Sequence, residues 1–414
     1  MSTPRAALTH APITQFSNVD GELCVSGVPL GRLAARAGRT PFYVYDRQLI
    51  SARVASLRTM LPQTIRLHYA VKANPMPALL AHLAPLVDGF DVASAGEMAK
   101  ALDAGMAAAN ISFAGPGKRH EELAQALAAG VVLNIESARE LDAATRIAEQ
   151  TGYTARVAIR VNPGFDLKTS GMKMGGGPQP FGIDAEEVPA LLRRMTRGAC
   201  EFTGFHIYAG SQNLRAEAIG AALRQSFELV LRLAQSAPAP VRSVNLGGGF
   251  GVPYFPGEAP LDLAPVAATL TDIAAQAATQ LPGAELVIEL GRYLVGEAGL
   301  YVTRVVDKKI SRGRQYLVTD GGLNHHLAAS GNFGQVIRKN YPVCIGNRMG
   351  QPPTSLPATV VGPLCTPLDV LAEAAQLPDA EVGDLIVVFQ SGAYGASASP
   401  LNFLGHPPAV EMLV

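Results

Sequence analysis

A lysine ends a short apolar run in the sequence HYAVKAN, where Leu67, Tyr69 and Val71 precede Lys72 at alternate positions. Burial lowers the pKa of an amine and favours the neutral form, which can form a Schiff base with an aldehyde. A lysine at the end of a strand can also extend into solvent. Taken alone, Lys72 fits this second interpretation better, so its chemistry depends on the motifs around it.

A run of glycines in VNLGGGFG contains Gly248 and Gly249. Glycines allow backbone N–H groups to approach an anion such as a phosphate, although such runs are as often simple tight turns. The patterns GxGxxG and GxxxxGK[ST] are absent, which argues against a dinucleotide or a nucleoside triphosphate. A single phosphate fits this run better.

The sequence ELGRY places Glu289 three residues before Arg292. A carboxylate can keep a pyridine nitrogen protonated, and a guanidinium can hold phosphate or carboxylate oxygens. An ordinary surface ion pair explains this motif alone equally well. In GFHIYAGSQ, the rings of His206 and Tyr208 could stack on a ligand and Ser211 could bind phosphate, but a packed aromatic strand is a reasonable alternative.

These motifs fall at the ends of β-rich runs that alternate with helical patterns between residues 64 and 292. Alternation of this kind predicts parallel βα units, and eight units close a (β/α)₈ barrel whose chemistry lies at the carboxyl ends of its strands. The eight runs cover residues 64–72, 89–94, 111–115, 131–136, 155–162, 202–211, 243–250 and 285–292.

Beyond Arg292 the long amphipathic patterns give way to strand-like runs such as LYVTRVVDKKI and DLIVVFQSGAY. This change predicts a second, mostly β domain. We expect residues 38–295 to form the barrel. Residues 1–37 and 296–414 should form the β domain, with the N-terminal segment ELCVSGVPLGRLAARAG joining its sheet.

The composition excludes several classes of function. The 414 residues are 48% hydrophobic but contain no apolar run of about 18 residues, so no membrane span is expected. Acidic and basic side chains balance at 34 each, which gives no field to attract nucleic acid. Four scattered cysteines and no signal-like N-terminus predict a reduced, cytoplasmic protein, and no cluster has metal-ligand spacing.

The motifs YAVKAN, FDVASAGE, GFHxxxGSQ, LGGGF, ExGR, GPLC and SGAY occur in the order found in the fold-type III decarboxylases that use pyridoxal 5'-phosphate (PLP). The chain therefore resembles the diaminopimelate, ornithine and arginine decarboxylase group over nearly its whole length. The resemblance implies an alanine-racemase-like barrel with a β domain, bound PLP, and a homodimer whose active sites draw on both subunits.

The resemblance also implies a role for each matching residue. Lys72 resembles the Schiff-base lysine, and Glu289 resembles the acid at the pyridinium nitrogen. Cys365 of GPLC resembles a proton donor supplied by the neighbouring subunit. The other residues that match cofactor-binding positions are Asp91, His206, Tyr208, Ser211, Gly248, Gly249, Gly291, Arg292 and Tyr394.

Two departures from the family bear on cofactor stacking and on the substrate. Tyr208 stands where the family has a histidine that stacks on the cofactor. We expect Tyr208 to stack as well, but its ring has no nitrogen that can be protonated. Thr366 stands where diaminopimelate decarboxylases have a glutamate that grips the distal amine, which makes free diaminopimelate a less favoured substrate.

Other positions imply contacts with the substrate. Arg338 and Tyr341 resemble a pair that binds the distal carboxylate, at a spacing one residue shorter, and Asp369 resembles an acid of ornithine decarboxylases. Arg292 and Tyr394 are further expected substrate contacts. The pattern is most similar to exosortase-associated decarboxylases and to the glutamyl-carrier-protein decarboxylase of butirosin biosynthesis.

These features predict PLP-dependent decarboxylation of an amino acid, free or tethered to an acyl carrier protein. Diaminopimelate decarboxylation in lysine biosynthesis and a non-catalytic, PLP-binding regulator are the alternatives. A racemase is disfavoured because alanine racemases place an arginine where Glu289 stands, and a small PLP-homeostasis barrel lacks the β domain.

Overall fold

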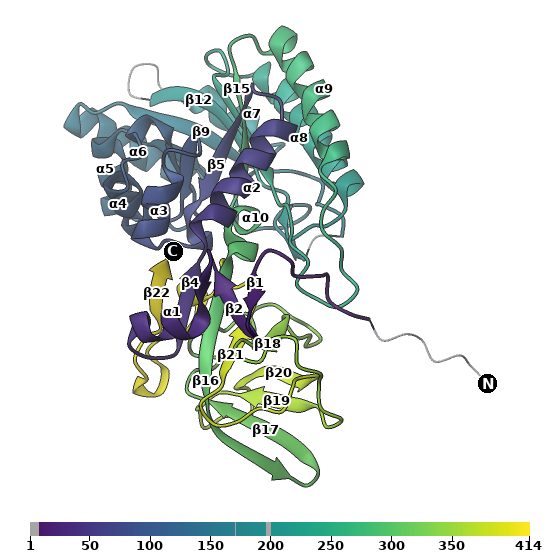
Figure 1. Ribbon diagram of the computed structural model, residues 1–414. Helices are drawn as coiled ribbons and strands as arrows, with labels where there is room; N and C mark the ends of the chain where they lie inside the picture. The colour runs from purple at the N-terminus through teal and green to yellow at the C-terminus, as the bar shows by residue number, and fades with distance from the viewer. Residues whose placement is uncertain (1–7, 170, 196–199) are drawn as a thin grey trace. The chain divides into compact units, whose positions relative to one another are not determined.

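The computed structural model describes residues 8–169, 171–195 and 200–414. The chain divides into two compact units. Unit 2 comprises Ser51–Val252 and Leu261–Leu294, and unit 1 comprises the described residues up to Ile50 together with Pro253–Pro260 and Val295–Val414. Figure 1 shows the course of the chain through both.

Unit 2 is built on a closed parallel barrel. Its strands are β5 (Ile65–Ala70), β6 (Gly89–Val92), β7 (Ile111–Phe113), β8 (Val132–Ile135), β9 (Ala155–Asn162), β12 (Cys200–Ile207), β14 (Ser243–Gly248) and β15 (Glu285–Leu290). Each strand pairs in parallel with the next, and β15 pairs with β5 to close the ring. The (β/α)₈ prediction is confirmed, and each predicted run contains or overlaps one of these strands.

Helices follow the strands of the barrel. They are α2 (Arg47–Met60), which starts in unit 1, α3 (Pro77–Leu83), α4 (Ala95–Asp103), α5 (His120–Ala129), α6 (Ala138–Thr151), α7 (Val188–Arg194), α8 (Ala216–Ala234), α9 (Ala264–Gln280) and α10 (Arg292–Val295). The side chains of Ser94 and Ser137 cap α4 and α6 by accepting backbone N–H groups three residues on. Helices α8 and α9 lie side by side (Figure 1).

The barrel wall is built from side chains that alternate between its two faces. On β5, Leu67 and Tyr69 are fully buried, whereas Arg66 and His68 are partly exposed. Since successive side chains of a strand point to opposite faces, the same period that buries Leu67 and Tyr69 turns Arg66, His68 and Ala70 to the other face. The strand ends in a 3₁₀ turn, Val71–Ala73, which carries Lys72.

Unit 1 is mostly β, as predicted. Its main sheet has the order β18 (Val343–Ile345), β21 (Leu385–Val388), β16 (Gly299–Ser311), β17 (Arg314–Thr319), β19 (Ala358–Val361) and β20 (Val370–Ala375), with β4 (Phe42–Tyr45) joining β16 to β22 (Val410–Leu413). A smaller sheet of β1 (Ser17–Val19), β2 (Glu22–Val25) and β3 (Val28–Pro29) precedes α1 (Leu30–Ala37). Leu30 and Leu33 of α1 pack with Phe42, Val302 and Val387 in one hydrophobic core.

The expected boundary after residue 37 differs from this division of the chain. Residues 38–50 lie in unit 1 because β4 pairs with β16 on one side and with β22 on the other. Residues 253–260 also lie in unit 1, where Gln390 Nε2 donates to the carbonyl of Pro253 at 2.8 Å. In the described part of the chain, no helix is long and apolar enough to cross a membrane.

Candidate active site

Lys72 lies directly after β5, in the 3₁₀ turn at the carboxyl end of the strand. Its ammonium nitrogen is 5.3 Å from the centre of the Tyr208 ring, which follows β12. The positive charge of Lys72 contributes to lowering the pKa of Glu289. The structure therefore brings the predicted nucleophile, an aromatic ring and a carboxylate to one end of the barrel.

Glu289 and His206 form a buried pair near this end of the barrel. The carboxylate Oε2 of Glu289 is 3.1 Å from His206 Nε2, and both side chains are less than 10% exposed. Burial raises the pKa of Glu289, but the hydrogen bond and attraction of His206, together with Lys72 and Arg160, hold that pKa well below its usual range. An ionised carboxylate only accepts, so His206 Nε2 carries the proton of this hydrogen bond.

The glycine turn follows β14 and lies against neighbouring strand ends. Gly247 and Gly249 have φ values of 71° and 73°, a region that side chains other than glycine rarely adopt. A Cβ at Gly248 would overlap the carbonyl of Glu289, and one at Gly249 would overlap the carbonyl of Gly210. Only glycine permits this close approach of the turn to the segments that carry Glu289 and Ser211.

Three other predicted phosphate contacts lie after neighbouring strands of the barrel. Ser211 belongs to β13 (Gly210–Ser211), which pairs with β10 (Met172–Lys173). Gly291 ends the β15 segment, and a Cβ there would come within 2.9 Å of Ala73, next to Lys72. Arg292 follows as the first residue of α10. The segment that carries Gly291 and Arg292 thus borders the turn that carries Lys72.

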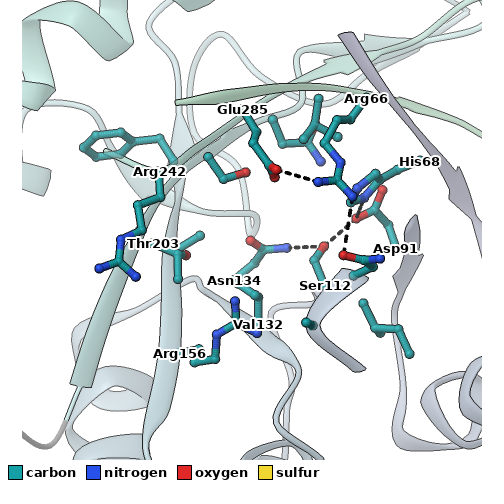
Figure 2. A pocket seen from close by; sticks show the side chains of 18 of the residues that line it. Arg66, His68, Asp91, Ser112, Val132, Asn134, Arg156, Thr203, Arg242 and Glu285 are labelled. Carbon is teal, nitrogen blue, oxygen red and sulfur yellow. Dashed lines mark hydrogen bonds and ion pairs between the residues drawn. The ribbon is translucent and has the colours of Figure 1, made fainter. Parts of the chain in front are cut away.

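Asp91 lies inside the barrel on β6 and is 7% exposed. Its Oδ1 accepts the Ser112 hydroxyl at 2.5 Å and lies 3.3 Å from His68 Nδ1. With these two residues, Asp91 lines a cavity that opens at the amino ends of the strands (Figure 2). The role of Asp91 in cofactor binding stays a prediction.

A second buried ion pair, which the sequence analysis missed, joins several βα loops of the barrel. Glu136, after β8, accepts Arg160 Nη1 at 2.8 Å and the backbone N–H groups of Gly115 and Gly182. Burial raises the pKa of Glu136, but Arg160 and Lys118 outweigh it and lower that pKa. The guanidinium of Arg160 lies 5.2 Å from the ring centre of Phe181 and contributes to lowering the pKa of Glu289. The sequence signal that could have indicated this ion pair is a charged residue, Arg160, within the strand-like run 155–162.

The expected proton donor and the adjacent acid belong to unit 1. Cys365 is exposed in the loop between β19 and β20. Asp369 is only 2% exposed, and its two carboxylate oxygens accept the backbone N–H groups of Leu323 and Leu364 at 2.6 and 2.8 Å. These bonds fix the shape of the Cys365 loop. The substrate contact expected of Asp369 stays a prediction.

Three other expected substrate residues also lie in unit 1, whereas Arg292 lies in unit 2. Arg338 donates to the carbonyl groups of Ser330 and Val370 at 2.9 and 2.6 Å. Tyr341 is 4% exposed, and its ring centre is 4.5 Å from that of Tyr254. The ring of Tyr394 lies 6.3 Å from that of Phe333. The structure gives each side chain a packing or backbone partner, and their substrate contacts stay predictions.

The groups at the carboxyl end of the barrel have the chemistry that PLP requires. An amine can bind the aldehyde, an aromatic ring can stack, and a buried carboxylate held ionised can neutralise a protonated pyridine nitrogen. Because the glycine turn has no side chains, a phosphate could approach its backbone closely. Lys72, Tyr208, Glu289 and the turn around Gly248 therefore fit this cofactor.

Comparisons with known proteins agree with this chemistry. Residues 47–296 match the family model described as pyridoxal-dependent decarboxylase, pyridoxal binding domain. The chain is 40% identical over 384 residues to the L-glutamyl-[BtrI acyl-carrier protein] decarboxylase of Niallia circulans, covering 90% of this chain and 88% of that protein. It is 32% identical to the diaminopimelate decarboxylase of Aquifex aeolicus, covering 95% and 91%.

The fold has close counterparts among solved structures. The diaminopimelate decarboxylase from M. jannaschii in co-complex with L-lysine superimposes with a TM-score of 0.88 at 25% identity, covering 97% of this chain and 93% of that one. The structure of AQ1208 from Aquifex aeolicus gives a TM-score of 0.82 at 29% identity, covering 97% and 92%. The similarity therefore extends over both units.

Proposed function

Because the chain belongs to the pyridoxal-dependent decarboxylases, we propose that it decarboxylates an aminoacyl group tethered to an acyl carrier protein, with Lys72 holding PLP as a Schiff base. PLP, when bound, accepts the electrons of the bond that breaks as carbon dioxide leaves. The observation that carries the proposal is the arrangement of Lys72 beside Tyr208, with its charge acting on the buried, ionised Glu289.

The residues of this chain have distinct tasks in the proposal. Lys72 supplies the amine that holds the cofactor, and Tyr208 supplies a flat face beside it. Glu289 supplies a negative charge for the ring nitrogen, and His206 keeps that carboxylate ionised. Gly248 and Gly249 provide the turn for the phosphate. Cys365, in its exposed loop, would deliver a proton to the carbon that has lost carbon dioxide.

Two observations support a tethered substrate over a free one. The Niallia circulans relative, 40% identical to this chain, is named for a glutamyl group on an acyl-carrier protein. Thr366 replaces the acid that would hold the distal ammonium of free diaminopimelate. The distal group of a carrier-bound substrate is joined to the carrier and has no positive charge. The neutral Thr366 can therefore face it without the loss of an ion pair.

The exposed surface of unit 1 supports the proposed homodimer. Val336, Ile337 and Leu368 are 101%, 76% and 57% exposed, and Val336 and Leu368 line the same groove as Thr366. Exposed apolar side chains gathered near one groove are typical of a protein interface. A second copy of the chain that covers these side chains would bring its own active-site residues next to the Cys365 loop. A shared active site requires this arrangement.

Activity on free diaminopimelate is the alternative reaction, and a PLP-binding protein without activity is the second alternative. Several diaminopimelate decarboxylases are 32 to 34% identical to this chain and cover more than 90% of it. This similarity supports diaminopimelate decarboxylation as the alternative. Retention of Lys72, Glu289 and Cys365 favours a working enzyme over an inactive binder.

The cytoplasm is the compartment proposed, because all four cysteines are free in the structure.

The proposal is tested in two steps. First, the purified protein incubated with PLP should show a visible absorption band that borohydride removes, and Lys72→Ala should lack it. A colourless wild type, or a band retained by Lys72→Ala, would contradict the cofactor assignment. Second, carbon dioxide release is measured with glutamyl and other aminoacyl carrier proteins and with free diaminopimelate, lysine, ornithine, arginine and glutamate. Release from free diaminopimelate alone would overturn the carrier-bound substrate.

A further inference from the structure

The amino end of the barrel encloses a cavity of about 360 Å³ whose lining residues, apart from Asp91, have no part in the proposed decarboxylation. All of its lining residues belong to unit 2. They include the first residues of three strands, Val132 of β8, Ser243 of β14 and Glu285 of β15. Glu285 and Glu289 occupy opposite ends of one strand, about 13 Å apart at the usual rise per residue. The cavity therefore opens at the face opposite Lys72.

Many of the side chains that line the cavity are small or polar, although Phe205 and Val287 also contribute. Barrels of this type are usually filled by layers of branched apolar side chains. Here Ser112, Asn134 and Thr203 line the cavity (Figure 2), together with Ala158 and Asn245. These side chains leave a hydrogen-bonding space where a packed core is expected.

The deep end of the cavity carries a buried carboxylate with an unused acceptor. Asp91 Oδ1 accepts from Ser112 and faces His68, and Ser112 in turn accepts from Asn134 Nδ2 at 3.1 Å. Asp91 Oδ2 is buried and has no hydrogen-bond partner among the described residues. A buried carboxylate oxygen without a donor is costly, so this atom provides a binding position for an N–H or O–H group.

The open end of the cavity carries three arginines with unequal partners. Arg66 lies 2.5 Å from Glu285, and Arg242 lies 2.5 Å from Glu201. Among the described residues, Arg156 has only a 3.9 Å contact with Glu201 and one 3.3 Å hydrogen bond to a backbone carbonyl, and its side chain is 30% exposed. Arg156 is therefore the arginine at this rim with the most capacity for a further anion.

We propose that this cavity binds a small zwitterion, an amino acid or a short ω-amino acid, with its ammonium at Asp91 and its carboxylate at Arg156. The buried carboxylate selects a cationic N–H donor because its Oδ2 has no hydrogen-bond partner among the described residues. The exposed guanidinium selects the opposite charge at the other end of the ligand. A volume of about 360 Å³ lies within the range of small-molecule sites.

Apart from Asp91, this site shares no residue with the predicted PLP site, so its test must silence the latter. Holoenzyme is treated with borohydride, which makes the Lys72 link permanent, and γ-aminobutyrate is titrated by calorimetry. Butylamine and butyrate, which each keep one charge of the probe, are titrated in parallel. We expect γ-aminobutyrate to bind at least about tenfold more tightly than either. Equal binding of the three compounds, or no binding, would overturn the proposal.

Variants locate the binding to the cavity. Arg156→Gln should weaken γ-aminobutyrate binding about tenfold, since it removes the guanidinium at a partly exposed position. Arg194→Gln is the matched control, because Arg194 pairs with Asp142 on the surface and lies outside the cavity. Ala158→Leu should abolish binding by filling the space, with thermal unfolding as the check on folding.

A crystal structure of the untreated holoenzyme soaked in γ-aminobutyrate gives an independent result. We expect the probe to lie between Asp91 and Arg156. Water alone in the cavity, or binding by Arg156→Gln equal to that of Arg194→Gln, would show that the space is only a hydrated part of the barrel. Neither outcome depends on which substrate the enzyme decarboxylates.

Discussion

The imidazole Nε2 of His206 lies 3.1 Å from the carboxylate Oε2 of Glu289, and both side chains are almost completely buried. The pair joins β12 to β15 across the inside of the barrel. Burial alone would favour a neutral carboxyl group, but the hydrogen bond holds the pKa of Glu289 well below its usual range. Glu289 is therefore already negatively charged before a cofactor with a cationic ring nitrogen would bind beside it.

Replacing Glu289 by Gln should reduce kcat by at least about a hundredfold, because the neutral amide no longer stabilises positive charge on the cofactor ring. Carbon dioxide release at saturating substrate measures the effect. His206→Asn retains the carboxylate but removes its imidazole partner, so the pKa of Glu289 should rise and the acid limb of the pH profile should move to higher pH. An unchanged acid limb would contradict the role assigned to His206.

Gly249→Ala should greatly weaken PLP binding, since the new methyl group would overlap the carbonyl of Gly210 and φ is 73°. Gly152→Ala is a matched control, because its φ is 74° and no atom lies within 4 Å of the added Cβ. Both variants lose about 1 kcal/mol of stability from the strained φ alone. Spectroscopic titration with PLP should separate them, and equal PLP affinities would argue against the glycine turn as the phosphate site.

Asp369→Asn should destabilise the protein by about 2 kcal/mol, because one backbone N–H would face an amide NH₂ in place of an oxygen. The amide oxygen can accept from either Leu323 or Leu364, and the other of the two loses its acceptor. Asp379→Asn, at an exposed position paired with Lys308, should stay within about 0.5 kcal/mol of wild type. Urea unfolding measures both, and similar losses would show that Asp369 does not hold the Cys365 loop.

His326 makes the stability of the protein sensitive to acid. Burial lowers the pKa of His326 to about 3, whereas a histidine in the unfolded chain titrates near about 6.5. The unfolded state therefore binds the proton first, and the stability contribution is complete above about pH 6.5 and is lost as the pH falls toward 3. Between pH 7 and 5, wild type should lose about 2 kcal/mol more than His326→Gln. Equal losses in urea unfolding would exclude this mechanism.

Mixing two impaired variants tests the shared active site. If each site takes Lys72 from one subunit and Cys365 from the other, a mixed dimer of Lys72→Ala and Cys365→Ala contains one complete site. Random exchange of subunits should then restore about a quarter of wild-type activity. Each variant incubated alone is the control. A mixture that remains as slow as its components, although light scattering shows dimers that exchange, would place both residues in the same subunit.

The barrel could be predicted from the sequence because its strands and helices have strong local periods. Each strand is a short apolar run, and the residues that end these runs must gather at one face once the barrel closes. Lys72, Ser211 and Glu289 were identified in this way. The mostly β character of unit 1 was also readable, since β-branched runs and turns replace the helical pattern after Arg292.

The contacts that could not be predicted join residues with no local relation. Glu136 and Arg160 belong to different βα units, and neither has a spacing that predicts their ion pair. The hydrogen bonds of Asp369 reach back to Leu323, 46 residues earlier, so its burial could not be inferred from CTPLD. The cavity depends on side chains from all eight strands of the barrel, which no single segment reveals.

Strand β4 gains its two neighbours late. It begins at Phe42, but its partners are β16, which starts at Gly299, and β22, which ends at Leu413. The barrel, in contrast, needs only the chain up to Leu290 for β15 to pair with β5. During synthesis the barrel can close while β4 is still without its neighbours, and unit 1 must wait for the last residues to leave the ribosome. Removing a few residues from the C-terminus should therefore harm unit 1 first.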